Sequence, residues 1–124
     1  MENEPSWKVL IINSNETFNK TAVKLISLMP GSIEVQSINN ATEAPRKWRK
    51  MSPNCVLVNV ENGCFNHPVV IKRELPEVMV IGMVLFNDDL KYYYNSKFSS
   101  FDGLVSQERF TEQIVHFIHT KTSV

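Results

Sequence analysis

Short, nearly continuous runs of apolar residues recur along the chain and predict its strands. They cover Trp7 to Ile12, Cys55 to Val60 and Val78 to Leu85, and a shorter run covers Gly103 to Val105. An uninterrupted apolar run of this length is typical of a strand that is covered on both faces of a parallel sheet. Ile33 and Val35 instead alternate with polar residues, which predicts a strand near the edge of the sheet.

Segments with apolar residues at helical spacing separate these strands. Thr17 to Met29 predicts the first helix, and Pro30-Gly31 ends its pattern. A less regular helix is predicted from a Thr42 cap to about Met51, with Pro45 in its first turn and Trp48 as its apolar anchor. Further helices are expected from Pro68 to Leu75, from the cap Asn87-Asp88-Asp89 toward Phe98, and from about Glu108 to Thr120, where Phe110, Ile114, Phe117 and Ile118 form the inner stripe.

Strand and helix therefore alternate five times in one domain, residues 1 to 124, with a core from about 7 to 120. This alternation predicts an α/β fold of three layers, a five-stranded parallel sheet with helices on both faces. In such folds the functional atoms come from the loops that follow the strands. The informative residues are then Asn13, Ser14, Asn59, Val84, Leu85, Gln107 and Glu108.

Composition and charge exclude several classes of protein. Hydrophobic residues make up 43% of the chain and charged residues 21%, which are values of globular proteins. Thirteen basic residues balance thirteen acidic ones, so no overall field attracts nucleic acid or an anionic membrane. The run from Arg46 to Lys50 is interpreted as a solvated helix face. A polar start and the lack of a long apolar run predict a cytoplasmic protein that does not enter a membrane, with Cys55 and Cys64 reduced.

The chain resembles the receiver domains of two-component response regulators, the CheY-like superfamily, over about residues 7 to 120. Two features carry the resemblance: Pro53-Asn54 stands a few residues ahead of Asn59, and the segment from Val80 to Asp88 is similar to the fourth-strand region of LuxR/NarL-type regulators. The resemblance implies a flavodoxin-like (βα)5 fold. It also implies a site at the carboxyl ends of the strands.

Position by position, the groups that receivers use in phosphoryl transfer are replaced. Receivers end their first strand on two acidic residues, and Asn13 and Ser14 stand there. Asn59 occupies the position of the aspartate that accepts the phosphoryl group. Val84 replaces a Ser or Thr, and Gln107 replaces a Lys, with Glu108 after it. Leu104 occupies the position of the aromatic switch residue.

These replacements have a direct chemical consequence. The amide of Asn59 cannot form an acyl phosphate, because its nitrogen lone pair is delocalised. Asn13, Ser14 and Asn59 supply no anionic oxygen to a hard divalent cation, and only Glu61 nearby could contribute one. The resemblance and this chemistry together predict a degenerate phospho-acceptor pocket, formed by Asn13, Ser14, Asn59, Val84 and Gln107, with no catalytic residue, no cofactor and no metal.

The predicted function is an atypical receiver domain that regulates other proteins without phosphorylation, in two-component signalling or transcription control. The resemblance implies a protein partner or a homodimer, through the first and fifth helices or through the fourth and fifth helices. Tyr92, Tyr93 and Tyr94 are consecutive and cannot all face inward on a helix, so they are predicted, with Leu104, to form an interaction surface.

Two other interpretations remain open. A small ligand-binding domain or enzyme could use the same crevice, although the chain has no glycine-rich phosphate loop and no Gly-x-Ser-x-Gly elbow. His116 and His119 lie three residues apart, a spacing that can bind metal but more often places cations near a helix C-terminus. DNA binding would require an output domain after Thr120, so these residues themselves are not expected to bind nucleic acid.

Overall fold

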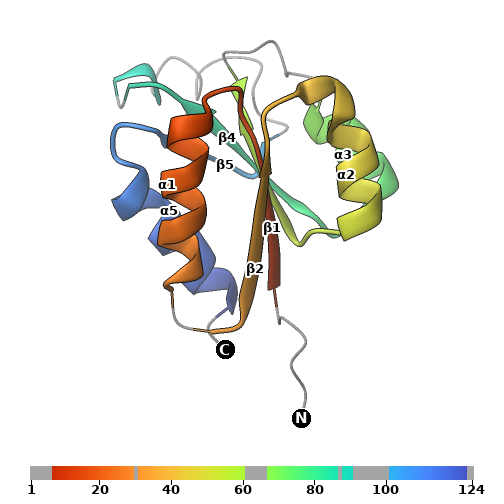
Figure 1. The fold of residues 1–124 in the computed structure, drawn as a ribbon, viewed down its shortest axis with the longest axis horizontal. Helices are drawn as coiled ribbons and strands as arrows, with labels where there is room; N and C mark the ends of the chain where they lie inside the picture. Colours follow the sequence, from red (N-terminus) through yellow and green to blue (C-terminus); the bar gives the residue numbers. More distant parts are fainter. Residues whose placement is uncertain (1–6, 30, 61–66, 87, 91–100, 123–124) are drawn as a thin grey trace.

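The computed structural model describes residues 7–29, 31–60, 67–86, 88–90 and 101–122. Five parallel strands form one sheet in the order β2-β1-β3-β4-β5 (Figure 1). They are β1 (Trp7–Ile12), β2 (Ile33–Ile38), β3 (Cys55–Asn59), β4 (Met79–Val84) and β5 (Gly103–Ser106). The order 2-1-3-4-5 is that of flavodoxin-like sheets, so the predicted fold class is confirmed.

Helices cover both faces of this sheet. In Figure 1, α1 (Glu16–Ser27) and α5 (Phe110–Thr122) lie on one side, and α2 (Ala44–Met51) and α3 (His67–Glu74) lie on the other. The helix predicted from the cap Asn87-Asp88-Asp89 toward Phe98 falls largely outside the described residues. Only its start, at Asp89 and Leu90, is seen as helical. No helix among the described residues has the length and apolar character needed to span a bilayer.

The cap of the second helical segment differs from the prediction. A single 3₁₀ turn, η1 (Ala41–Glu43), comes before α2, and the side chain of Asn40 accepts a hydrogen bond from the backbone N–H of Thr42 at 2.9 Å. The cap is therefore Asn40 and not Thr42. The physical reason is that an Asn side chain readily accepts from the N–H two residues ahead. Pro45 lies in the first turn of α2, as predicted.

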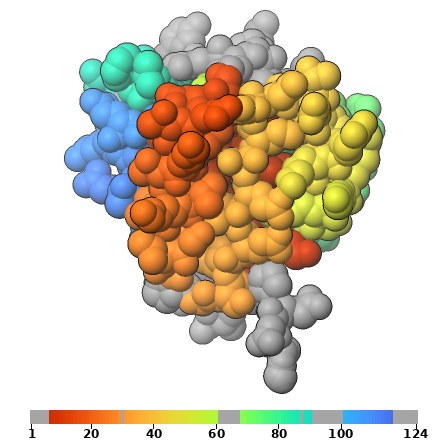
Figure 2. All heavy atoms as spheres, in the orientation of Figure 1, coloured from red at the N-terminus to blue at the C-terminus, as the bar shows by residue number. Residues whose placement is uncertain are grey.

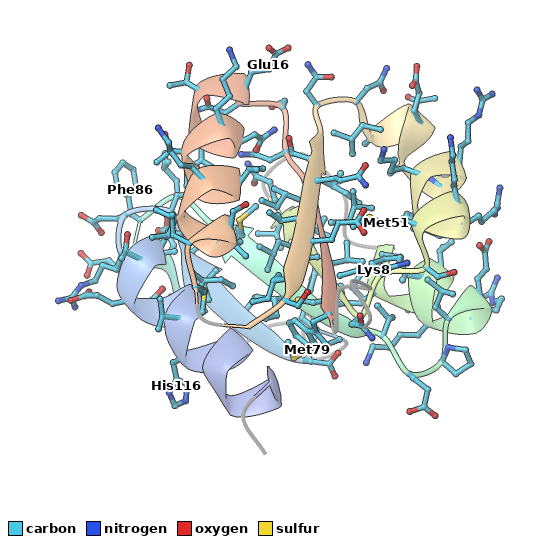
Figure 3. All side chains as sticks on the ribbon, turned by 60° about the horizontal axis from the view of Figure 1, so that its bottom comes forward. Lys8, Glu16, Met51, Met79, Phe86 and His116 are labelled. Carbon is cyan, nitrogen blue, oxygen red and sulfur yellow. The ribbon has the colours of Figure 1, made fainter. Side chains whose placement is uncertain are left out.

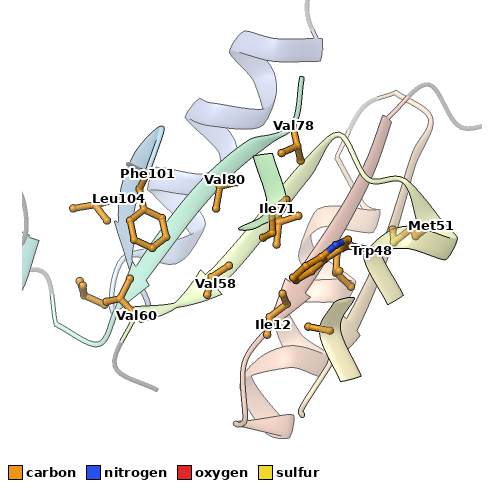
Figure 4. Packing of buried hydrophobic residues seen from close by; sticks show 14 residues of the cluster. Ile12, Trp48, Met51, Val58, Val60, Ile71, Val78, Val80, Phe101 and Leu104 are labelled. Carbon is orange, nitrogen blue, oxygen red and sulfur yellow. The ribbon is translucent and has the colours of Figure 1, made fainter. Parts of the chain in front are cut away.

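The core consists of two apolar clusters, one on each face of the sheet. Along β1, Leu10 and Ile12 belong to the cluster under α2 and α3, which Figure 4 shows, whereas Val9 and Ile11 belong to the cluster under α1 and α5. This division explains why the strand sequence is continuously apolar. Gly82 of β4 permits close packing in the first cluster, since a Cβ there would lie 2.8 Å from a methyl carbon of Leu104.

Asn54 fixes the start of β3 against its neighbours. Its side-chain oxygen accepts from the backbone N–H of Lys8 at 2.8 Å, and its own N–H donates to the carbonyl of Lys8 at 2.8 Å. Its carbonyl accepts from the N–H of Met79 at 2.9 Å. One amide residue therefore bonds to both flanking strands, which sets the register of the three central strands.

A polar contact joins α2 to α3 beside the first cluster. Trp48 is fully buried, and its Nε1 donates to Oε1 of Glu74 at 2.9 Å. Arg49 donates from Nε and Nη2 to the two oxygens of the same carboxylate, each at 2.9 Å. The hydrogen bonds from Arg49 and then from Trp48 lower the pKa of the Glu74 carboxyl to about 2. An Arg and a carboxylate that share two parallel hydrogen bonds interact more strongly than a pair with a single contact.

The lowered pKa predicts how stability depends on pH. A carboxyl whose pKa is lower in the folded state stabilises the protein above its unfolded pKa, 4.5, and loses that contribution as the pH falls toward 2. In urea unfolding at about pH 3 and about pH 7, Glu74→Gln should destabilise the protein more at the higher pH. The exposed Glu77→Gln is the matched control and should show no such difference. Equal losses for Glu74→Gln at both pH values would contradict the prediction.

Candidate functional site at the carboxyl ends of the strands

Two asparagines meet where β1 and β3 end. Asn13 directly follows β1, and Asn59 is the last residue of β3, its neighbour in the sheet. Nδ2 of Asn59 donates to Oδ1 of Asn13 at 2.8 Å, and the two residues are only 7% and 3% exposed. The structure thus brings together two residues of the predicted pocket, and they bond directly to each other.

A third amide, which the sequence did not identify, completes this group. Asn19 of α1 is 3% exposed, and its Nδ2 donates to the backbone carbonyl of Asn13 at 2.7 Å. Asn19 lies on the inner stripe of α1 with Ala22 and Ile26, which are the other buried residues of the helix. A polar residue at a core position of an amphipathic helix was therefore the available signal.

This group of three amides, Asn13, Asn19 and Asn59, contains no ionisable side chain. Nδ2 of Asn13 and Oδ1 of Asn19 are buried and have no hydrogen-bond partner in the protein. A buried amide without a hydrogen-bond partner costs stability. One donor and one acceptor of the three asparagines therefore remain available for a further polar contact. It has no charge with which to hold an ion.

The remaining residues of the predicted pocket occupy the same edge of the sheet. Ser14 is exposed, and Val84 is fully buried at the end of β4. The backbone N–H of Gln107 donates to the carbonyl of Val84 at 2.7 Å. Gln107 and Glu108 line a separate groove between α1 and α5.

That groove has a volume of about 350 Å³ and also includes Phe18 and Leu25 of α1 and Phe110 and Thr111 of α5. The rings of Phe18 and Phe110 meet edge to face, with centroids 5.1 Å apart. This contact holds α1 against α5 and forms an apolar wall of the groove.

The predicted interaction surface is wrong for Leu104. This residue is 4% exposed and belongs to the apolar cluster under α2 and α3. The reason is the alternation of side chains on β5, together with the space that Gly82 leaves on the adjacent strand. Tyr92, Tyr93 and Tyr94 lie outside the described residues.

Among the described residues, no group of three or more His, Cys, Asp or Glu side chains could hold a metal ion. Burial, and secondarily the charge of Asp102, raises the pKa of the Cys55 thiol far above its ordinary value, so this cysteine is an apolar core residue. His116 is exposed on α5. Glu61, Cys64 and the side chain of His119 lie outside the described part of the chain.

No protein-family model matches the chain, and no curated protein matches it by sequence. Solved structures match it closely in three dimensions. A LuxR-family DNA-binding response regulator from Staphylococcus aureus superposes with a TM-score of 0.72 at 20% identity, over 92% of this chain and 97% of that one. A LuxR-family two-component response regulator from Aurantimonas sp. SI85-9A1 gives 0.75 at 14% identity, over 93% and 84%.

A CheY-like response regulator receiver domain from Methylobacillus flagellatus gives a TM-score of 0.67 at 12% identity, over 92% of this chain and 97% of that one. The fold is that of receiver domains. The similarity spans nearly the whole chain, including the carboxyl ends of β1 and β3. In this chain that place holds the pair Asn13 and Asn59.

The bond between the two amides predicts a measurable coupling. Asn13→Ala removes the acceptor of a buried Asn59 N–H group and should lower the free energy of unfolding by about 1 to 3 kcal/mol. Ser14→Ala, at an exposed neighbour, should change it by less than about 0.5 kcal/mol. Urea unfolding of Asn13→Ala, Asn59→Ala and the double variant completes the cycle. Strictly additive losses would show that the bond contributes nothing.

Proposed function

We propose that the chain is an atypical receiver domain that works as a regulatory protein-interaction module in two-component signalling or transcription control, independently of phosphorylation. The proposal includes a non-enzymatic role in the cytoplasm. The receiver fold supports the signalling context. The hydrogen bond from Asn59 to Asn13 supports independence from phosphate.

This hydrogen bond replaces the interactions that a phosphorylated receiver requires. An aspartate at the end of β3 would be a nucleophile and, with the acidic residues after β1, a ligand for a divalent cation. In this chain the two matching side chains are neutral and bond to each other at 2.8 Å. Neither an acyl phosphate nor a carboxylate–cation contact can form from these two groups.

The other matched positions support the same proposal. Val84 is buried at the end of β4 and has no hydroxyl group to bond to a phosphoryl oxygen. Gln107 has no positive charge, and the adjacent Glu108 adds a negative one. Since developing negative charge needs cations or hydrogen-bond donors, restoring the acceptor aspartate alone leaves the site without them.

A phosphorylation assay tests this proposal. The wild-type protein and the Asn59→Asp variant are incubated with magnesium and labelled acetyl phosphate, and both should remain unlabelled. An ordinary receiver domain is the positive control and should be labelled under the same conditions. The variant should fold, because Asp and Asn have nearly the same shape and the Asn13 amide can turn to donate. Circular dichroism checks this. Stoichiometric labelling of Asn59→Asp would overturn the proposed loss of phosphoryl chemistry.

We further propose that the groove between α1 and α5 is the surface through which the module binds a second copy of itself. The groove offers the apolar wall of Phe18 and Phe110, and Val115 on α5 is 37% exposed. Apolar side chains that line a surface groove, with a further exposed apolar residue on the same helix, are compatible with a contact surface. The fourth and fifth helices remain the other face expected from the resemblance, although most of the fourth lies outside the described residues.

A charged residue in this groove should disrupt the contact. Thr111→Arg places a long cation in a groove whose lining includes Phe18, Leu25 and Phe110, and should weaken self-association about tenfold in light scattering over a concentration series. Thr42→Arg makes the same change at an exposed position of η1 and should leave self-association unchanged. A wild-type protein that stays monomeric at every concentration would contradict the proposed dimer without bearing on the phosphorylation assay.

A further inference from the structure

A hollow of about 340 Å³ lies at the edge of the sheet, beside the beginning of β1. Lys8 of β1, Glu34 and Gln36 of β2, and Lys47, Lys50 and Met51 of α2 line it. Figure 2 shows the surface hollowed between β2 and α2, and Figure 3 shows Lys8 near Met51. Lys8 and Asn13 lie at opposite ends of β1, so this hollow is separate from the amide group.

The alternation of side chains on β2 explains why the hollow is polar. Ile33 and Val35 contact the apolar cluster under α1 and α5. Glu34 and Gln36 therefore point to the opposite face, toward α2. The register of the sheet places Lys8 directly beside Glu34. On α2, Trp48 turns into the core, and Lys47 and Lys50, three residues apart, lie beside β2.

Positive charge is in excess in this hollow. The ion pairs among the described residues are Arg49–Glu74, Lys72–Asp102 and Arg109–Glu112, and none includes Lys8, Lys47 or Lys50. Among the described residues of the lining, Glu34 is the one carboxylate, and it accepts a hydrogen bond from Nε2 of Gln36 at 2.5 Å. Within this described lining, three lysines stand against one glutamate, an excess of two positive charges.

The ammonium group of Lys8 is held in place. Its Nζ donates to the carbonyl of Met51 at 3.4 Å, at the C-terminal end of α2, where the helix dipole favours a cation. The protein as a whole carries no net charge, so the excess is a property of this hollow and not of the surface in general. A concave surface lined by like charges concentrates the field and attracts small counter-ions.

We propose that this hollow binds a compact phosphate-rich anion of the diphosphate class, either as free pyrophosphate or as the diphosphate of a nucleotide. The lysines would supply point charges to the phosphate oxygens, as lysine does in other phosphate sites. The two excess positive charges match an anion with two or more negative charges. Nucleic acid fits less well, since it requires cations along an extended face and this chain is neutral overall. The inference does not depend on the proposed function.

The test is calorimetric titration with inorganic pyrophosphate and with ADP, at low and constant ionic strength. Lys47→Gln/Lys50→Gln removes two cations of the hollow and should weaken binding about tenfold. Lys20→Gln/Lys24→Gln makes the same charge change on exposed positions of α1 and should change binding less than about twofold. All variants alter exposed or half-buried side chains, and circular dichroism checks that they fold.

A change of opposite sign sharpens the test. Glu34→Gln removes the carboxylate found in the described part of the lining and should tighten pyrophosphate binding about threefold, whereas Glu43→Gln on η1 should not. Tighter binding of ADP than of pyrophosphate would identify a nucleotide, and equal binding would identify the free diphosphate. Equal losses in the two lysine variants, no binding of either anion, or binding of duplex DNA alone would overturn the inference.

Discussion

Burial of β1 on both faces is the constraint on which the rest of the structure depends. Val9 and Ile11 face α1 and α5, while Leu10 and Ile12 face α2 and α3, so helices must cover both sides of this strand. With β2 and β3 as its two neighbours, the only polar places left along β1 are its ends. Lys8 stands near one end and Asn13 just beyond the other, and the lysine-lined hollow and the group of three amides include these two residues.

The spacing of apolar residues along the chain was enough to predict the strands of the sheet and the helices that cover its two faces. Continuous apolar strands indicated two covered faces, and the alternating residues of Ile33 to Val35 placed β2 at an edge, where the structure has it. The turn η1 before α2 and its cap at Asn40 were not predicted, because such boundaries depend on single side chains that can bond in several ways.

The candidate site was predictable only in part, and the reason is physical. The carboxyl ends of adjacent parallel strands must meet, which places Asn13 beside Asn59. The approach of Asn19 depends on the rotation of α1 about its axis, and the contact of Trp48 and Arg49 with Glu74 depends on how α2 and α3 pack side by side. Neither the rotation of α1 nor the packing of α2 beside α3 can be inferred from the spacing of residues along the chain. Leu104 failed as a surface residue because Gly82, on the next strand, lets it pack inward.

The two amides also form an attractive contact where two carboxylates would repel each other. Two carboxylates 2.8 Å apart in a buried place would repel strongly, so one would have to bind a proton, or a cation would have to bridge them. Asn59 and Asn13 have nearly the same shape as such a pair, yet one donates where the other accepts. The two amides therefore attract each other, whereas two carboxylates in the same place would repel. The ends of β1 and β3 are therefore joined by a hydrogen bond between two neutral side chains, which needs no cation to offset a charge.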